Sequence, residues 1–178
     1  QAPQARIPRR VGVSGVKHLQ VLPGVFLYGA TLAAAAVAPA KIFSDHMVLQ
    51  RDTKVPVWGK AEVGAAVEVE FAGHVVSAKT DTDGRWKVML PPMKASAKSR
   101  DLVSRSSGSK SVLKDVLVGD VWFAGGQSNM DFKVNGMARR LVEGKELADA
   151  ANYPAIRHRK VSERNAAVPQ SDLTGGRW

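Results

Sequence analysis

The chain has 178 residues, which is long enough for one domain, or for a small domain with part of another. It has no cysteine, which excludes disulfides, thiolate chemistry and cysteine-ligated zinc. The formal net charge is +10, from 26 Lys and Arg against 16 Asp and Glu. Because these charges are scattered among strand-like segments and no nucleic-acid-binding motif accompanies them, we expect no nucleic-acid partner.

The first forty residues have the layout of a secretory signal. Four basic residues and no acidic residue lie in this stretch, and an apolar run from Val21 to Leu32 leads into an alanine-rich segment that ends at Ala40. Residues 1–40 are therefore predicted to be a signal peptide for periplasmic or secreted export, with membrane contact only during that export. The alternative is a retained anchor or a lipid-tethered form, which the prolines and the weakly hydrophobic alanines disfavour.

The predicted cleavage site is the small-residue stretch Ala38-Pro39-Ala40, which makes Lys41 the candidate mature N-terminus. The stretch Ala35 to Ala38 offers alternative sites. A cysteine-free chain is compatible with any redox compartment, so the N-terminal segment alone carries the prediction of localisation.

Residues 41–114 read as a small β-sandwich domain. Apolar residues recur at every second position in short runs, which is typical of strands with one buried face. The predicted strands are 55–59, 66–71, its hairpin partner 74–80, and 85–90, the last opened by the turn 81–84 and stopped by Pro91-Pro92. Trp58, Phe71 and Trp86 are the expected packing residues. The polar segment 94–110 allows a loop, a weak edge strand or a linker.

Residues 115–178 read as the beginning of an α/β domain. The run Val116 to Phe123 is nearly continuous in apolar residues, as in a strand covered on both faces. A helix is predicted over 137–151, ended by Tyr153-Pro154, and a second strand over 155–161. Too few residues follow to complete such a sheet, so this domain is expected to be incomplete.

The stretch "AGGQSNM" at 124–130 places a serine where the predicted strand 116–123 breaks into a loop. Gly125 and Gly126 allow a close backbone approach and a turn that lifts Ser128 off the strand end. A serine nucleophile needs a base within hydrogen-bond reach and donors for the oxyanion. The motif is not the G-x-S-x-G elbow, because Met130 stands at the last glycine position. Taken alone it leaves both a catalytic serine and an ordinary turn serine open.

Four longer words carry a resemblance to a known family. The chain resembles the N-terminal part of bacterial sialate O-acetylesterase-like proteins, which belong to the SGNH/GDSL-type esterases. The words are "FSDHMVLQRDTKVPVWGKAEVGAAVEVEFAG" at 43–73, "TDTDGRWKVMLPPMKA" at 80–95, "LKDVLVGDVWFAGGQSNMDF" at 113–132 and "YPAIRHRKV" at 153–161. They occur in the family's order and together cover nearly all of residues 42–178.

The resemblance implies an exported carbohydrate esterase that removes acetyl groups from sugar hydroxyls through an acyl-enzyme, with no metal or organic cofactor. Its fold would be a β-sandwich at residues 41–114 followed by the beginning of an SGNH-like, flavodoxin-like hydrolase domain at residues 115–178. Ser128 matches the family's nucleophile, and its backbone N–H would be one oxyanion donor. Asn129 matches the same block, and we assign it only to shaping the loop. The partner would be an acetylated carbohydrate, either sialic acid or a polysaccharide ester, while the oligomeric state is unknown.

The family also uses a glycine and an asparagine from later blocks, and an Asp-x-x-His pair as orienter and base. No Asp-x-x-His occurs in this sequence. We therefore expect the chain alone to be incomplete and inactive.

Each local candidate to replace the missing pair has a simpler interpretation. His46 lies in the entry to the sandwich, His74 in a predicted hairpin and His158 on a predicted strand, and no two share the spacing of metal ligands. Asp81 and Asp83 flank a glycine turn, so a glycosidase pair is disfavoured. Asp120 is a predicted strand-end residue and Asp131 a possible helix cap.

The four tryptophans are possible sugar-stacking residues. Core packing is the preferred interpretation for Trp58, Trp86 and Trp122, and Trp178 is left undetermined. Two alternatives to the esterase remain open at this point. One is an exported β-sandwich module that binds carbohydrate or protein and carries a vestigial esterase segment. The other is a truncated reading frame with an unstable product.

Overall fold

The computed structural model describes residues 35–178 except 132, 163–164 and 177. Of the predicted signal peptide, residues 1–34 lie outside the described residues and residues 35–40 are described. The chain divides into two units, 1–32 and 33–178, and only the second is described here. Among its described residues, no helix is long and apolar enough to cross a membrane.

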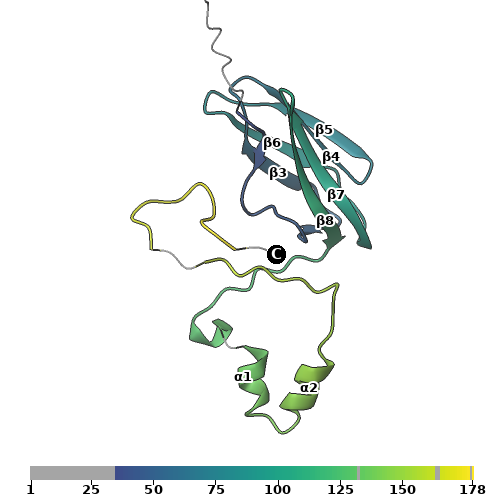
Figure 1. The fold of residues 1–178 in the computed structure, drawn as a ribbon, viewed down its shortest axis with the longest axis vertical. Helices are drawn as coiled ribbons and strands as arrows, with labels where there is room; N and C mark the ends of the chain where they lie inside the picture. The colour runs from purple at the N-terminus through teal and green to yellow at the C-terminus, as the bar shows by residue number, and fades with distance from the viewer. Residues whose placement is uncertain (1–34, 132, 163–164, 177) are drawn as a thin grey trace, which may run out of the picture. The chain divides into compact units, whose positions relative to one another are not determined.

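The second unit is mostly β-strand, arranged in two sheets (Figure 1). The three-stranded sheet has the order β1-β3-β6 and is antiparallel. Its strands are β1 (Ala38–Pro39), β3 (Val55–Lys60) and β6 (Arg85–Leu90).

The five-stranded sheet has the order β2-β8-β7-β4-β5. Every pairing in it is antiparallel except that of β2 with β8, which is parallel. Its strands are β2 (Val48–Gln50), β4 (Ala66–Phe71), β5 (His74–Lys79), β7 (Ser96–Ser106) and β8 (Ser109–Gly119).

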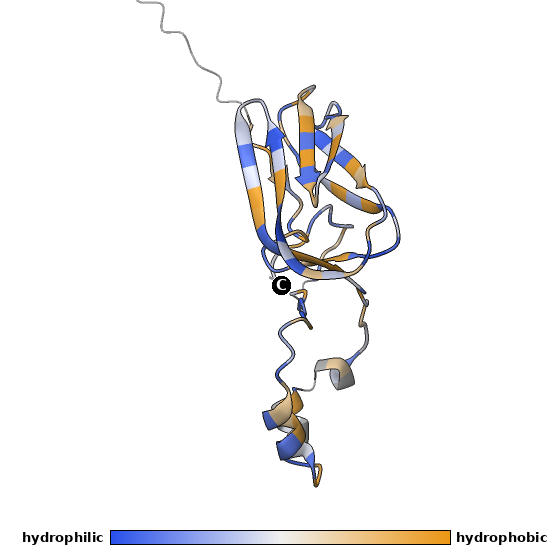
Figure 2. Ribbon diagram, turned by 90° about the vertical axis from the view of Figure 1, so that its right-hand side faces the viewer, coloured by the Kyte–Doolittle hydropathy of each residue, from blue (hydrophilic) through white to orange (hydrophobic). Residues whose placement is uncertain are grey.

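One hydrophobic cluster draws on both sheets. Alternating side chains of β3, β4 and β6 are buried, and bands of apolar and polar residues alternate along the strands in Figure 2. The buried members include Val57, Val67, Val69, Phe71, Trp86, Val88, Leu90, Leu102, Val116 and Val118. This confirms Phe71 and Trp86 as core residues, whereas Trp58 is half-buried.

Several predicted elements are confirmed. Strands β3, β4, β5 and β6 lie where the alternating pattern placed them, and β4 and β5 form the expected hairpin. The turn before β6 is held by Asp81, whose Oδ1 accepts from the backbone N–H of Asp83 at 2.9 Å and of Arg85 at 2.8 Å. Asp81 therefore has the side-chain to backbone role that the sequence indicated, whereas the side chain of Asp83 pairs with Arg85 at 3.5 Å.

The polar segment 94–110 is neither a linker nor an edge. Most of it is β7, an internal strand that pairs with β8 on one side and β4 on the other. Its inward positions are Leu102, Ser104 and Ser106, all buried. Two of these three buried side chains are serines, which are small and polar. On the other face, Arg105 pairs with Glu70 at 2.9 Å. The strand therefore shows little of the apolar alternation by which strands are predicted.

The strand predicted at 116–123 is wrong in its bounds. β8 begins at Ser109 and ends at Gly119, because its neighbour β2 ends at Gln50, the partner of Gly119. β1 precedes residue 41 and β8 passes residue 114, so the two sheets extend beyond both ends of the predicted sandwich. The division into domains at 40/41 and 114/115 stays a prediction.

The beginning of a second sheet, expected over 115–178, is not formed among the described residues. The predicted strand at 155–161 is absent, and the predicted helix over 137–151 is two short helices, α1 (Val134–Ala138) and α2 (Gly144–Ala150). A strand at 155–161 would need a neighbour, and within the described chain its arginines instead reach back to the loop before β2. Few helices beside two sheets are consistent with an incomplete esterase-like domain.

β1 bears on the predicted export signal. Val37 is buried and its backbone N–H donates to Ser109 Oγ at 2.8 Å. Gly59 of β3 lets β1 approach, because a Cβ there would collide with the carbonyl oxygen of Ala38 and lie 2.8 Å from Trp86 Cζ2. A cut immediately before Lys41 would remove this strand from the sheet.

Candidate active site

Ser128 lies at the start of a short 3₁₀ helix, η1 (Ser128–Asp131). The chain leaves β8 at Gly119 and is fixed there by two contacts: Arg51 Nε donates to Asp120 Oδ1 at 2.9 Å, and the N–H of Val121 donates to Gln50 Oε1 at 2.8 Å. Asp120 is thus the strand-end residue that the sequence predicted. The side chain of Asp131 is not described, so its predicted role as a helix cap is untested.

Gly126 lies against the side chain of Met130 in the turn that presents Ser128. A Cβ on Gly126 would overlap the side chain of Met130, whose backbone N–H donates to Gln127 O at 2.9 Å. The turn therefore folds Met130 back over Gly126 and leaves Ser128 exposed. The hydroxyl of Ser128 is therefore accessible to a substrate.

Within the described residues, the Ser128 hydroxyl has no hydrogen-bond partner. None of the three candidate histidines is joined to it: His74 is in β5, His158 is exposed outside any strand, and His46 pairs with a different residue. The described part of the chain thus places no histidine base at Ser128, and the side chain of Asn129 is not described.

His46 belongs to a cluster that no motif in the sequence indicated. Its Nδ1–H donates to Asp115 Oδ2 at 2.7 Å, and Arg157 Nη2 donates to the same oxygen at 2.9 Å. Arg157 Nη1 also donates to the carbonyl oxygens of His46 and Asp115. Since His46 and Asp115 are 69 residues apart, no local pattern in the sequence could have paired them.

The cluster strongly favours the ionised carboxylate of Asp115. The hydrogen bond from His46, followed by those from Ser99 and Arg157, holds the pKa of Asp115 far below its usual range. Both His46 and Asp115 have left-handed backbones, with φ of 66° and 54°. In serine hydrolases a histidine beside a carboxylate acts as the base and the group that orients it. Here the contacts of His46 and Asp115 instead connect the loop before β2 with β8 and with Arg157.

Trp122 and Phe123 correct a further prediction. Trp122 was expected in the core, yet it is 88% exposed, and Phe123 is 97% exposed. These side chains lie beyond the last paired residue of β8, so no second sheet covers them within the described chain. Trp178, by contrast, packs against the core cluster, and its Nε1 donates to Ile42 O at 3.0 Å.

Metal ligands do not gather in the described part of the chain. No group of three or more His, Asp or Glu side chains is placed there to hold a metal ion.

The chain is similar to sialate O-acetylesterases from mammals. It is 31% identical to the mouse protein over 145 residues and 30% identical to the human protein over 164 residues. These matches cover 76% and 86% of the chain, but 26% and 30% of those relatives. A match to 86% of the 178 residues leaves out about 25, so Ser128, which is 50 residues before Trp178, lies within it.

A solved structure is similar in fold as well as in sequence. It is a carbohydrate acetylesterase from Xanthomonas citri, with a TM-score of 0.73 and 38% identity, and the match covers 80% of this chain and 32% of that protein. No protein-family model matches the chain. The chain thus spans about a quarter to a third of its relatives' length, and over the matched part it belongs to a sialate O-acetylesterase-like family.

Proposed function

We propose that the chain is part of a carbohydrate O-acetylesterase in which Ser128 is the nucleophile. The observation that carries the proposal is an exposed serine at the start of the short helix η1, which follows β8, in a chain similar to a carbohydrate acetylesterase. The substrate would be an acetyl ester on a sugar hydroxyl, either of a sialic acid or of a polysaccharide.

The reaction proposed is acyl transfer in two steps. The Ser128 hydroxyl gives its proton to a base as its oxygen attacks the carbonyl carbon of the acetyl ester. The tetrahedral intermediate then breaks the bond to the sugar oxygen, which takes that proton from the base and leaves as a hydroxyl, and acetyl-serine remains. Water then releases acetate. The backbone N–H of Ser128 is proposed as one donor to the oxyanion of each tetrahedral intermediate.

The base and the other oxyanion donors are proposed to come from polypeptide that this chain lacks. Two observations support this: no histidine of the described residues contacts Ser128, and the sequence has no Asp-x-x-His. We assign the two sheets to a β-sandwich, which would then be a non-catalytic module beside the esterase domain.

The test is a chimera in which this chain replaces the matching third of the Xanthomonas citri acetylesterase. We expect the chimera to hydrolyse an acetylated sugar, and Ser128→Ala to lower its turnover by at least about 1,000-fold. Ser171→Ala, the same change at an exposed serine outside the motif, is the matched control and should leave turnover unchanged. A chimera that is active and indifferent to Ser128→Ala would show that another group is the nucleophile.

The 178-residue chain alone provides the complementary test. We expect no serine-dependent hydrolysis of p-nitrophenyl acetate, since the nucleophile has no base. Hydrolysis by this chain that Ser128→Ala removes would contradict the proposed incompleteness.

We further propose that the protein is exported and that processing leaves β1 in place. The basic and then apolar sequence of residues 1–32 supports export, and the buried Val37 favours the alternative cleavage sites before it over the site before Lys41. The mass of the exported protein checks this, since a mature chain beginning at Lys41 would be inconsistent with retention of β1.

A further inference from the structure

The outer face of the three-stranded sheet carries an unusual set of side chains, which we name the basic face. Lys54, which directly precedes β3, belongs to it together with Trp58 and Lys60 of β3. The remaining members are Arg85, Lys87 and Met89 of β6. These residues alternate with buried ones along the two strands, so they lie on one face. The strand register sets Trp58 opposite Lys87 and Lys60 opposite Arg85.

Among the described residues, three of the four cations on this face have no counter-ion. Lys54, Lys60 and Lys87 make no ion pair or side-chain hydrogen bond within the described part of the chain. Arg85 has one carboxylate partner, Asp83, at 3.5 Å. By comparison, Arg105 on the five-stranded sheet has two, Glu68 and Glu70.

The register makes this arrangement costly in the free protein. Like charges directly opposite each other on neighbouring strands destabilise a sheet, and Lys60 and Arg85 are such a pair. Lys87 is two residues from Arg85 on the same face of β6. An anionic ligand would relieve this repulsion, so the charges point to a negatively charged partner.

The face also offers an aromatic surface. Trp58 is half-buried and meets Phe43 edge-on, with the ring centroids 4.7 Å apart and the planes at 77°. This contact fixes the indole among the lysines. The apolar C–H face of a sugar ring can stack on such an indole, whereas single-stranded nucleic acid is bound by several aromatic side chains in succession.

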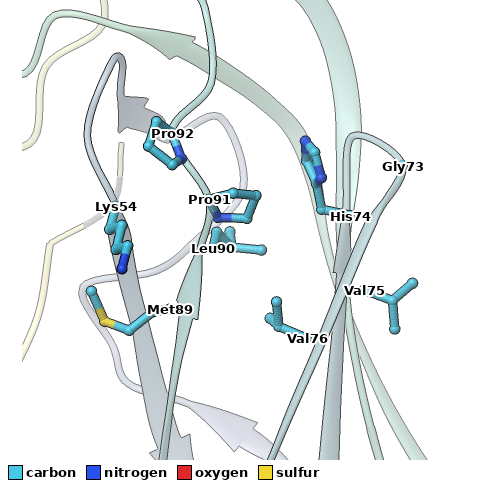
Figure 3. Close-up of a pocket in the computed structure, with 9 residues that line it drawn as sticks. All are labelled: Lys54, Gly73, His74, Val75, Val76, Met89, Leu90, Pro91 and Pro92. Carbon is cyan, nitrogen blue, oxygen red and sulfur yellow. The ribbon is translucent and has the colours of Figure 1, made fainter.

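A cleft of about 420 Å³ adjoins the basic face at its Lys54 end. Figure 3 shows Lys54 and Met89, which also belong to the basic face, side by side, with His74 and Val76 across from them. Pro91 and Pro92 line the same cleft. Its size is that of a pocket for a small ligand or a few sugar units.

We propose that the basic face and this cleft bind a carboxylated carbohydrate chain, with the carboxylates on the lysines and a sugar ring on Trp58. The anionic character of the ligand rests on the face alone. The choice of a carbohydrate also rests on the proposed function, because an esterase for polymeric sugars gains from a second contact with its substrate.

The test uses the whole 178-residue chain and calorimetric titration with an oligogalacturonide. We expect binding that weakens as salt is raised and no binding of an uncharged maltooligosaccharide of equal length. The double variant Lys60→Gln/Lys87→Gln should bind about tenfold more weakly, since two exposed charge contacts are lost. Lys60→Arg/Lys87→Arg should restore the affinity.

The matched control is Lys98→Gln/Lys110→Gln, which removes the same charge from the five-stranded sheet and should leave affinity unchanged. Equal weakening by both double variants, or no binding by the wild-type chain, would overturn the inference. Tighter binding of an oligothymidylate than of the glycan would overturn the choice of carbohydrate. Ser128→Ala should bind as wild type, so binding and turnover fail separately and the two proposals remain distinguishable.

Discussion

At the scale of single residues, Asp115 joins three segments of the fold through hydrogen bonds from His46 and Arg157. Its backbone is left-handed, and the segments that it joins are far apart in the sequence. Asn tolerates the left-handed region at least as well as Asp, so Asp115→Asn removes the charge with little change to the backbone. We expect this variant to unfold at a lower temperature than wild type at pH 7.

The same contacts predict how that difference depends on pH. The pKa of Asp115 is lowered in the folded state, first by the hydrogen bond from His46. Its stabilising effect is therefore complete above the unfolded-state value, about 3.9, and is lost as the pH falls below it. Thermal unfolding of both proteins between pH 7 and pH 3 measures this, and a difference that stays constant below pH 4 would contradict the assigned role.

At the scale of elements, β7 shows which parts of the fold the sequence could reveal. Strands β3, β4 and β6 were predicted because large apolar residues alternate with polar ones. β7 buries one large residue, Leu102, and two serines, so its strand character depends on two neighbours that no local pattern shows. The opposite error arose after Gly119, where an apolar run continues but the pairing partner ends.

Leu102 should be as important as any residue of the predicted strands. It is fully buried, so Leu102→Ala should lower the free energy of unfolding by about 3 kcal/mol through lost burial and a residual cavity. Leu141→Ala is the same change at a side chain that is 54% exposed and should cost less than about 0.5 kcal/mol. Denaturant unfolding of both variants measures this, and similar losses would mean that β7 is not a core strand.

At the scale of the whole molecule, local motifs and long-range pairings differ in how far a sequence reveals them, and the role of Ser128 as a nucleophile stays a prediction. Ser128 and its glycines were visible because the motif is local. The pairing of His46 with Asp115 was not, because it depends on the fold bringing distant residues together. The expected second sheet was predicted from the local pattern of residues 155–161 alone. A strand there also needs a neighbouring strand to pair with, and the described chain does not provide one.

The distribution of buried residues separates the two-sheet body from the C-terminal segment after it. Every fully buried apolar residue of the core cluster lies between Val37 and Val118, and among the described later residues only Trp178 packs against that cluster. The large apolar side chains of 121–168 are mostly exposed, including Trp122, Phe123 and Val142. We therefore expect a chain ending at Asp120 to keep a cooperative unfolding transition.

That shortened chain should still be less stable than the whole one. It loses the contacts of Arg157 with Asp115 and of Trp178 with Ile42, so its midpoint in denaturant should fall. The slope m, which scales with the surface exposed on unfolding, should stay in proportion to the surface that the shortened chain buries. Arg157→Gln in the full chain is the matched control, because it removes one of these contacts and keeps the length. A shortened chain without a cooperative transition would mean that residues after 120 are part of the folding unit.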